Sequence, residues 1–146
     1  ASAMKCNIFF ATFLLSFHSL AAYPAVTVEG LCFRGVKERA LRLELRIFSD
    51  SEAKWRGALV KYNGRDKPIS LVTRYSEESS SPVDMPSTIT TVWLEIYEGA
   101  ITGEYELMTH GASVDALSYR SFANSKITHF FHDSNTTWTA TQGCIW

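Results

Sequence analysis

The sequence has no excess of charge of either sign, and this argues against partners that a charged surface would attract. Its 146 residues contain 14 Lys and Arg against 15 Asp and Glu, which gives a formal net charge of −1. A nucleic-acid-binding chain of this size would be expected to carry a basic patch or stripe. We therefore expect no nucleic-acid partner.

The chain also lacks an apolar run long enough to cross a bilayer as a helix, which needs about 20 residues. The run from Ile8 to Phe17 has ten residues, follows Lys5 and precedes the small-residue site Ser19-Leu20-Ala21. These are the three parts of a secretory signal peptide, although an N-terminal core helix is the alternative.

We accordingly divide the chain into an expression scar (1–3), a signal peptide (4–21) and one mature β domain (22–146). Secreted material should begin at Ala22 or Tyr23. We expect a periplasmic or secreted protein, with no stable membrane insertion once the signal segment is removed.

Catalytic motifs are missing as well. No serine lies in a Gly-x-Ser-x-Gly turn, and no glycine-rich loop could hold a phosphate. Glu104 and Glu106 share one strand face, with Glu95 expected across a hairpin; such carboxylates could serve a glycosidase, or lie on a solvated outer face. We favour the outer face and expect no enzyme and no catalytic residue.

A metal site is not indicated either. His129, His132 and Asp133 are close in sequence, but side chains three residues apart on a strand point to opposite faces. We expect these histidines in the core or on the surface, with no metal and no cofactor.

Cysteine is scarce, and its positions are informative. Cys6 lies in the signal segment, which leaves Cys32 and Cys144. Two cysteines in an oxidising compartment pair by default, so we predict one disulfide between them; two buried free thiols are the alternative.

What the sequence does contain is alternation of period two, typical of strands with one buried face. Between Leu41 and Ile47, leucine and isoleucine alternate with charged residues. Similar segments, separated by turn residues, predict strands at Val26 to Phe33, Trp55 to Tyr62, Ile69 to Tyr75, Ile89 to Tyr97, Ile101 to Thr109, Val114 to Arg120, Lys126 to His132 and Thr137 to Trp146.

This spacing predicts an all-β fold, a small antiparallel barrel or sandwich of about eight to nine strands. The disulfide would join the first strand to the last and so favours a closed barrel over an open sandwich. We expect one long loop, from Ser76 to Ser87.

One strand suggests a recognition surface. If the aliphatic face of Ile89 to Tyr97 is buried, then Val92, Leu94 and Ile96 point inward and Trp93, Glu95 and Tyr97 point outward. Exposed aromatic rings beside a charge are typical of a binding surface for protein or sugar, although both faces of the strand could also be covered.

A short string adds a family resemblance. Thr102-Gly103-Glu104-Tyr105 resembles the Ser-Gly-x-Tyr-type motif of periplasmic lysozyme inhibitors, with Thr in place of Ser. The resemblance implies a small, exported, disulfide-bearing β protein in which Thr102 and Tyr105 belong to a loop that enters the lysozyme cleft. Within a strand, Gly103 could equally mark a bulge.

Together these observations predict an exported, non-catalytic binding protein, an inhibitor or immunity protein that neutralises an envelope-directed enzyme such as a cell-wall hydrolase or a toxin. The binding residues would be Trp93, Glu95, Tyr97, Thr102 and Tyr105. The alternative is a β-barrel module that binds a small ligand or a glycan.

Overall fold

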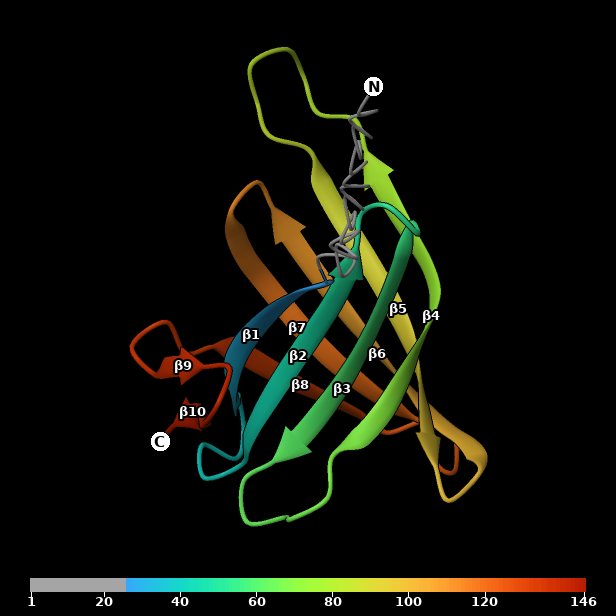
Figure 1. Cartoon of the computed structure of the whole chain (residues 1–146), viewed down its shortest axis with the longest axis vertical. Helices are drawn as coiled ribbons and strands as arrows, with labels where there is room; N and C mark the ends of the chain where they lie inside the picture. The colour runs from blue at the N-terminus through green and yellow to red at the C-terminus, as the bar shows by residue number, and fades with distance from the viewer. Residues whose placement is uncertain (1–25) are drawn as a thin grey trace, which may run out of the picture.

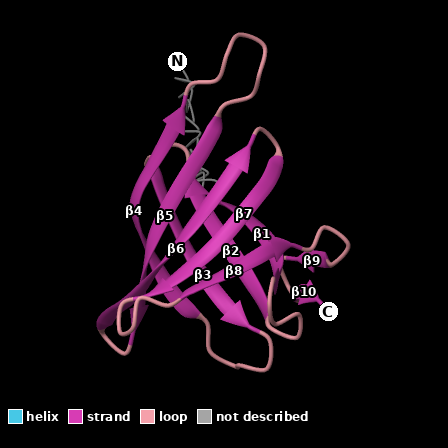
Figure 2. Ribbon diagram, turned by 180° about the vertical axis from the view of Figure 1, so that it is seen from behind, coloured by secondary structure: helices cyan, strands magenta, loops and turns pink. Residues whose placement is uncertain are grey.

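The computed structural model describes residues 26–146, and all of their regular secondary structure is β-strand (Figure 2). Eight strands form a closed antiparallel barrel in chain order (Figure 1). They are β1 (Val26–Gly35), β2 (Arg42–Asp50), β3 (Trp55–Tyr62), β4 (Ile69–Ser79), β5 (Thr88–Tyr97), β6 (Ala100–His110), β7 (Ser113–Ser121) and β8 (Ile127–His132). Two short strands, β9 (Thr137–Thr139) and β10 (Gly143–Ile145), form a separate sheet.

The predicted all-β fold, the barrel and the Cys32–Cys144 disulfide are thus confirmed. The expression scar, the signal peptide and its cleavage site lie outside the described residues. Within residues 26–146, no helix has the length and apolar character needed to cross a membrane.

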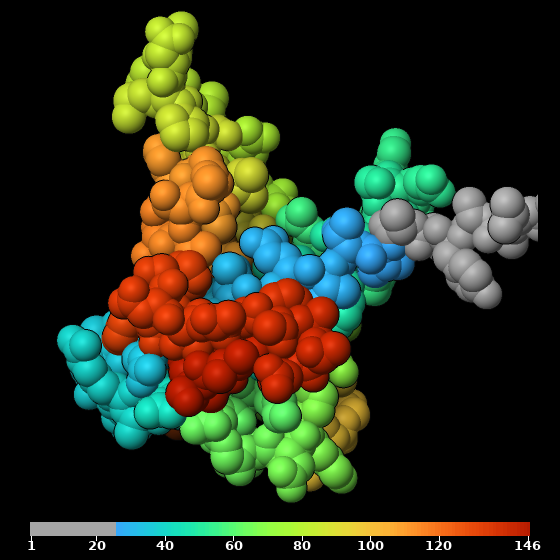
Figure 3. Space-filling model, turned by 60° about the vertical axis from the view of Figure 1, so that its left-hand side comes forward, coloured from blue at the N-terminus to red at the C-terminus, as the bar shows by residue number. Residues whose placement is uncertain are grey.

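The barrel closes differently from our expectation. Its seam joins β1 to β8 through three residue pairs, from Phe33 opposite His132 to Gly35 opposite Phe130. The last strand, β10, pairs with β9 and takes no part in the closure. This happens because the chain leaves the barrel after His132 and crosses its outer side (Figure 3).

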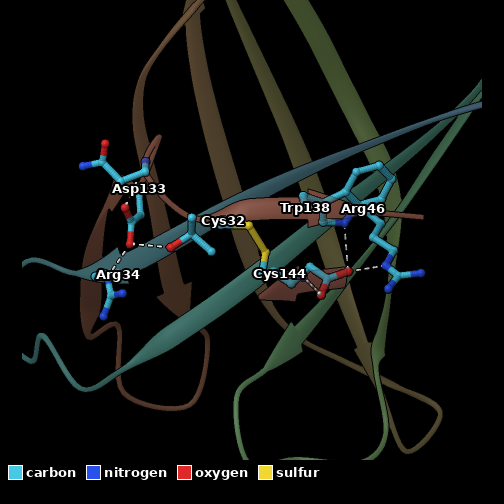
Figure 4. The surroundings of a disulfide bond; sticks show 9 residues. Cys32, Arg34, Arg46, Asp133, Trp138 and Cys144 are labelled. Atoms are coloured by element: carbon cyan, nitrogen blue, oxygen red, sulfur yellow. Dashed lines mark hydrogen bonds and ion pairs between the residues drawn. A yellow bond between two sulfur atoms is a disulfide. The ribbon is translucent and has the colours of Figure 1, made fainter. Parts of the chain in front are cut away.

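The segment from residue 137 to 146, which we call the C-terminal clasp, packs against β1 and β2. The ring of Trp138 lies directly over Gly30, where an added Cβ would be 1.8 Å from a ring atom. Glu44, buried on the outer face of β2, accepts hydrogen bonds from Trp138 Nε1 at 3.2 Å and from the Cys144 backbone N at 3.0 Å, and pairs with Arg46. The disulfide lies between these contacts and the Arg34–Asp133 pair (Figure 4).

Asp133 holds the turn that begins the crossing. Its backbone N donates to the Cys32 carbonyl at 2.8 Å, and its side chain accepts from Arg34 and from the Thr136 hydroxyl. These two side-chain hydrogen bonds, from Arg34 first, hold the pKa of Asp133 below its usual range.

The connections define two ends of the barrel. In Figure 1, the lower end carries the β1–β2, β3–β4, β5–β6 and β7–β8 connections, and the upper end carries the other three. The β5–β6 turn uses Glu98 and Gly99, both with positive φ, as a two-residue hairpin requires.

The long loop is shorter than predicted. Strand β4 continues to Ser79, because residues 76 to 79 pair with β5, so the loop runs from Ser80 to Ser87. This β4–β5 hairpin projects beyond the upper end of the barrel (Figure 1).

The core fills the barrel interior. Its fully buried side chains include Phe33, Leu43, Leu45, Val60, Trp93, Tyr105 and Leu117. Trp93 is 0% exposed and Glu95 is 6% exposed, so the prediction that both point outward is wrong. Val92 is buried as predicted, whereas Leu94 and Ile96 are only half-buried. In β5 the large ring of Trp93 fills the interior, and the aliphatic residues Leu94 and Ile96 lie on the outer face. Aliphatic residues suit a strand on either face, so their presence does not identify the buried one.

Candidate functional site

A buried carboxylate is the centre of the lower mouth of the barrel. Glu95 accepts three hydrogen bonds from hydroxyl groups: from Thr102 at 2.7 Å, from Tyr119 at 2.8 Å and from Tyr105 at 3.1 Å. The Tyr62 and Tyr105 hydroxyls lie 2.8 Å apart. Since Tyr105 donates its proton to Glu95, Tyr62 donates to Tyr105, and the chain Tyr62–Tyr105–Glu95 is continuous. We call Glu95, Thr102, Tyr62, Tyr105 and Tyr119 the mouth network.

A local irregularity brings Thr102 into this network. On β6 the residue opposite Glu95 is Gly103 and the residue opposite Ile96 is Ile101, so Thr102 is an extra residue, a β-bulge. The bulge lets Thr102 share the interior with Gly103 and Tyr105, which would otherwise alternate with it.

Gly103 makes room for the second tyrosine. A Cβ added at this position would lie 2.6 Å from the Tyr119 hydroxyl and 2.7 Å from the Arg120 carbonyl. The absence of a side chain allows the Tyr119 ring to cross β6 and reach Glu95, and the same ring packs on Tyr105 with centroids 4.7 Å apart.

The three tyrosines of the network keep their protons more strongly than free tyrosine. Burial raises the pKa of Tyr62, Tyr105 and Tyr119 above 10, and the neighbouring Glu95 carboxylate raises each of them further. Their hydroxyls therefore remain hydrogen-bond donors at neutral pH.

An open hollow of about 460 Å³ lies against this network. Most of its wall area is apolar, and its polar groups are a carboxylate, an amide, a guanidinium and the tyrosine hydroxyls. The lining residues are Leu41, Tyr62, Asn63, Arg65, Ile69, Glu95, Tyr97 and Tyr119. This volume lies within the range of small-molecule sites, about 300–1,000 Å³, and its lining has the usual character of such sites.

A second, smaller hollow of about 200 Å³ lies at the upper mouth. Trp93 lines it together with Thr91 and Leu107. The Trp93 Nε1 atom is buried and has no hydrogen-bond partner among the described residues. The volume of this upper hollow falls below the usual range for ligand sites, so the hollow at the lower mouth is the stronger candidate.

The five predicted binding residues are thus placed in different surroundings. Glu95, Thr102 and Tyr105 belong to the mouth network, and Tyr97, 45% exposed, lines the hollow at its edge. Trp93 lies further inside, opposite Tyr105. They therefore do not form the exposed aromatic surface that we predicted. The inhibitory role that the family resemblance gives Thr102 and Tyr105 stays a prediction.

Sequence reasoning missed Tyr62 and Tyr119. Each lies two residues beyond a fully buried aliphatic residue of its strand, Val60 and Leu117 respectively. Residues two apart on a strand share a face, so both tyrosines lie on the inner face of the barrel, at its lower end. This spacing is the sequence feature that could have predicted them.

The other candidate groups form no site. Glu104 pairs with Arg74 at 2.9 Å and with Arg120 on the outer face of the barrel, away from Glu95. Among residues 26–146 no group of three or more His, Cys, Asp or Glu side chains is placed to hold a metal ion.

Comparison of the chain with protein-family models, curated proteins and solved structures finds no match in any of the three.

Proposed function

We propose that this protein is an exported, non-catalytic binding protein that holds a small molecule in the lower mouth of its barrel. The observation that carries the proposal is the 460 Å³ hollow, which Glu95, Tyr62 and Tyr119 of the mouth network line. A mostly apolar hollow with a few fixed polar groups is suited to a small ligand, because the apolar wall supplies affinity and the polar groups fix orientation.

Pre-organisation supports the same proposal. The network is held by strands of a closed barrel, and its hydroxyls are already bonded to Glu95. A site on rigid strands loses little conformational entropy on binding. The disulfide is compatible with export to an oxidising compartment.

A fragment screen by protein NMR tests the proposal. We expect fragments to shift the backbone amides of Tyr62, Glu95 and Tyr119, and to do so more weakly in Tyr119→Phe, which lacks one hydroxyl. Glu106→Gln, on the exposed outer face of β6, is the matched control and should behave as the wild type. Failure of every fragment to bind at this mouth would contradict the proposal.

A second candidate function is binding of a partner enzyme, as an inhibitor or immunity protein. One observation favours it: the projecting β4–β5 hairpin carries Val83, 91% exposed, and Met85, 59% exposed, at its tip. Exposed apolar side chains on a projecting hairpin are suited to insertion into a pocket of another protein.

Affinity capture from envelope extract tests this candidate. The wild type should retain a specific protein that the variant Val83→Ser/Met85→Ser releases, whereas Val72→Ser, an exposed apolar residue away from the tip, should retain it. Equal capture by all three proteins would count against the hairpin as the binding element.

A further inference from the structure

The charge of the mouth network indicates what kind of small molecule it would bind. Glu95 is 6% exposed, and none of the ion pairs among the described residues includes it. Its three hydrogen bonds all come from neutral hydroxyl groups. All three groups that are hydrogen-bonded to Glu95 act as donors, which suits an ionised carboxylate. A buried charge without a counter-charge is unfavourable.

The wall of the hollow is also suited to a cation. Three tyrosines, Tyr62, Tyr97 and Tyr119, line it beside Glu95. Aromatic rings attract a positive charge placed over their faces, and rings grouped around an anionic side chain bind ammonium groups. The carboxylate uses three of its roughly four acceptor positions in the network, which leaves about one for a ligand.

We infer that the ligand of the lower mouth carries a cationic ammonium group, which Glu95 neutralises between the tyrosine rings. This inference rests on the proposed function, because it names the class of small molecule that the hollow would hold.

Arg65 is the one charged group of the lining that opposes this inference. It lies in the β3–β4 connection, is exposed, and forms no ion pair with Glu95 in the structure. A guanidinium at the rim repels a cationic ligand or competes with it for the carboxylate. Its removal should therefore strengthen binding of an amine, and this gives the inference a second, independent test.

The experiment compares three probes of similar size by isothermal titration calorimetry: 2-phenylethylamine, neutral 2-phenylethanol and anionic 3-phenylpropanoate. The amine should bind most tightly and the carboxylate least. In Glu95→Gln the amine should lose roughly 10- to 100-fold in affinity while the alcohol changes little, since a hydrogen bond to a charged group is the interaction removed. Arg65→Gln should bind the amine more tightly than the wild type does.

The matched control is Glu106→Gln, which removes the same charge from the outer face of the neighbouring strand. It should leave all three affinities unchanged, and so separates a local contact from a general change in net charge. If Glu95→Gln fails to fold, the ranking of the three probes on the wild type and the effect of Arg65→Gln still decide the question.

The outcomes separate this inference from the proposed function. Equal or tighter binding of the alcohol or the carboxylate at the lower mouth would overturn the ammonium inference and leave the proposed function standing. Absence of binding by all three probes, together with a fragment screen that finds no ligand at this mouth, would overturn both.

Discussion

At the residue scale, Glu95 is a buried polar group next to a barrel core whose side chains are mostly apolar. Its position is stabilised because Thr102, Tyr105 and Tyr119 satisfy its oxygens. Replacement of any one of these donors leaves a buried acceptor without its partner, which costs more than a surface hydrogen bond contributes.

Trp93 gives the sharpest prediction at this scale. It is 0% exposed and belongs to the core, so Trp93→Ala should lower the free energy of unfolding by about 3–5 kcal/mol. Denaturant unfolding measures the change. Tyr97→Ala, on the same strand but 45% exposed, is the control and should cost far less. Equal losses in the two variants would show that Trp93 does not belong to the core.

The mouth tyrosines give a prediction for alkaline pH. Their pKa values are raised above 10 in the folded protein, so the unfolded chain releases these protons first. The stability that they contribute is therefore fully present below about pH 10 and is lost as the pH rises beyond it.

Ultraviolet titration of tyrosinate in the folded protein should show a group of tyrosines that ionises at higher pH than free tyrosine. In Glu95→Gln this late group should move to lower pH, because the neighbouring negative charge is gone. Titration of all tyrosines in one step near pH 10 in the folded wild type would contradict the network.

At the element scale, the C-terminal clasp is attached to the barrel by side chains and a disulfide, and not by pairing with a barrel strand. Trp138 over Gly30 and Glu44 beneath Cys144 are its main contacts. Apart from the point where the disulfide holds it, such an element can loosen without breaking any β-ladder of the barrel.

Gly30→Ala should therefore displace Trp138 and loosen the clasp. We expect faster amide hydrogen exchange in β9 and β10, with little change in β3 to β6. Thr27→Ala, an exposed residue on the same strand, is the control and should leave the clasp protected. Uniform loss of protection through the barrel would show that the clasp and barrel unfold as one unit.

The strands could largely be predicted from the sequence, but the buried face of β5 could not. The ranges of the eight barrel strands were close to those observed, because alternation and turn residues such as Glu98-Gly99 are local signals. The single strand predicted from Thr137 to Trp146 is wrong, because this segment turns back on itself as the β9–β10 pair. The faces of β5 were inverted, because Val92, Leu94 and Ile96 are apolar on the outside while Trp93 and Glu95 are inside. Glu95 can be buried because hydroxyl groups of β6 and β7 donate hydrogen bonds to it. Alternation within β5 alone cannot predict these contacts, since they come from the neighbouring strands.

At the scale of the whole molecule, the disulfide joins positions 112 residues apart, and so restricts the unfolded chain strongly. Cys32→Ser/Cys144→Ser should lower the free energy of unfolding by about 2–5 kcal/mol. Thermal unfolding with and without reductant measures the same effect on the wild type. The variant should be insensitive to reductant; a wild type that is also insensitive would contradict the predicted role of the bond.

The short seam between β1 and β8 has a consequence for the order in which the molecule assembles. All the other barrel pairings join consecutive strands, so β1 to β8 can form as a series of neighbouring hairpins. Only the seam and the clasp need distant segments to meet, and such non-local contacts form late. Cys32 and Cys144 should therefore meet only in a nearly complete barrel. The disulfide should form after most of the barrel has folded, and it should not direct the folding of the strands. Quenched oxidative refolding would show native-like tyrosine burial before the disulfide appears.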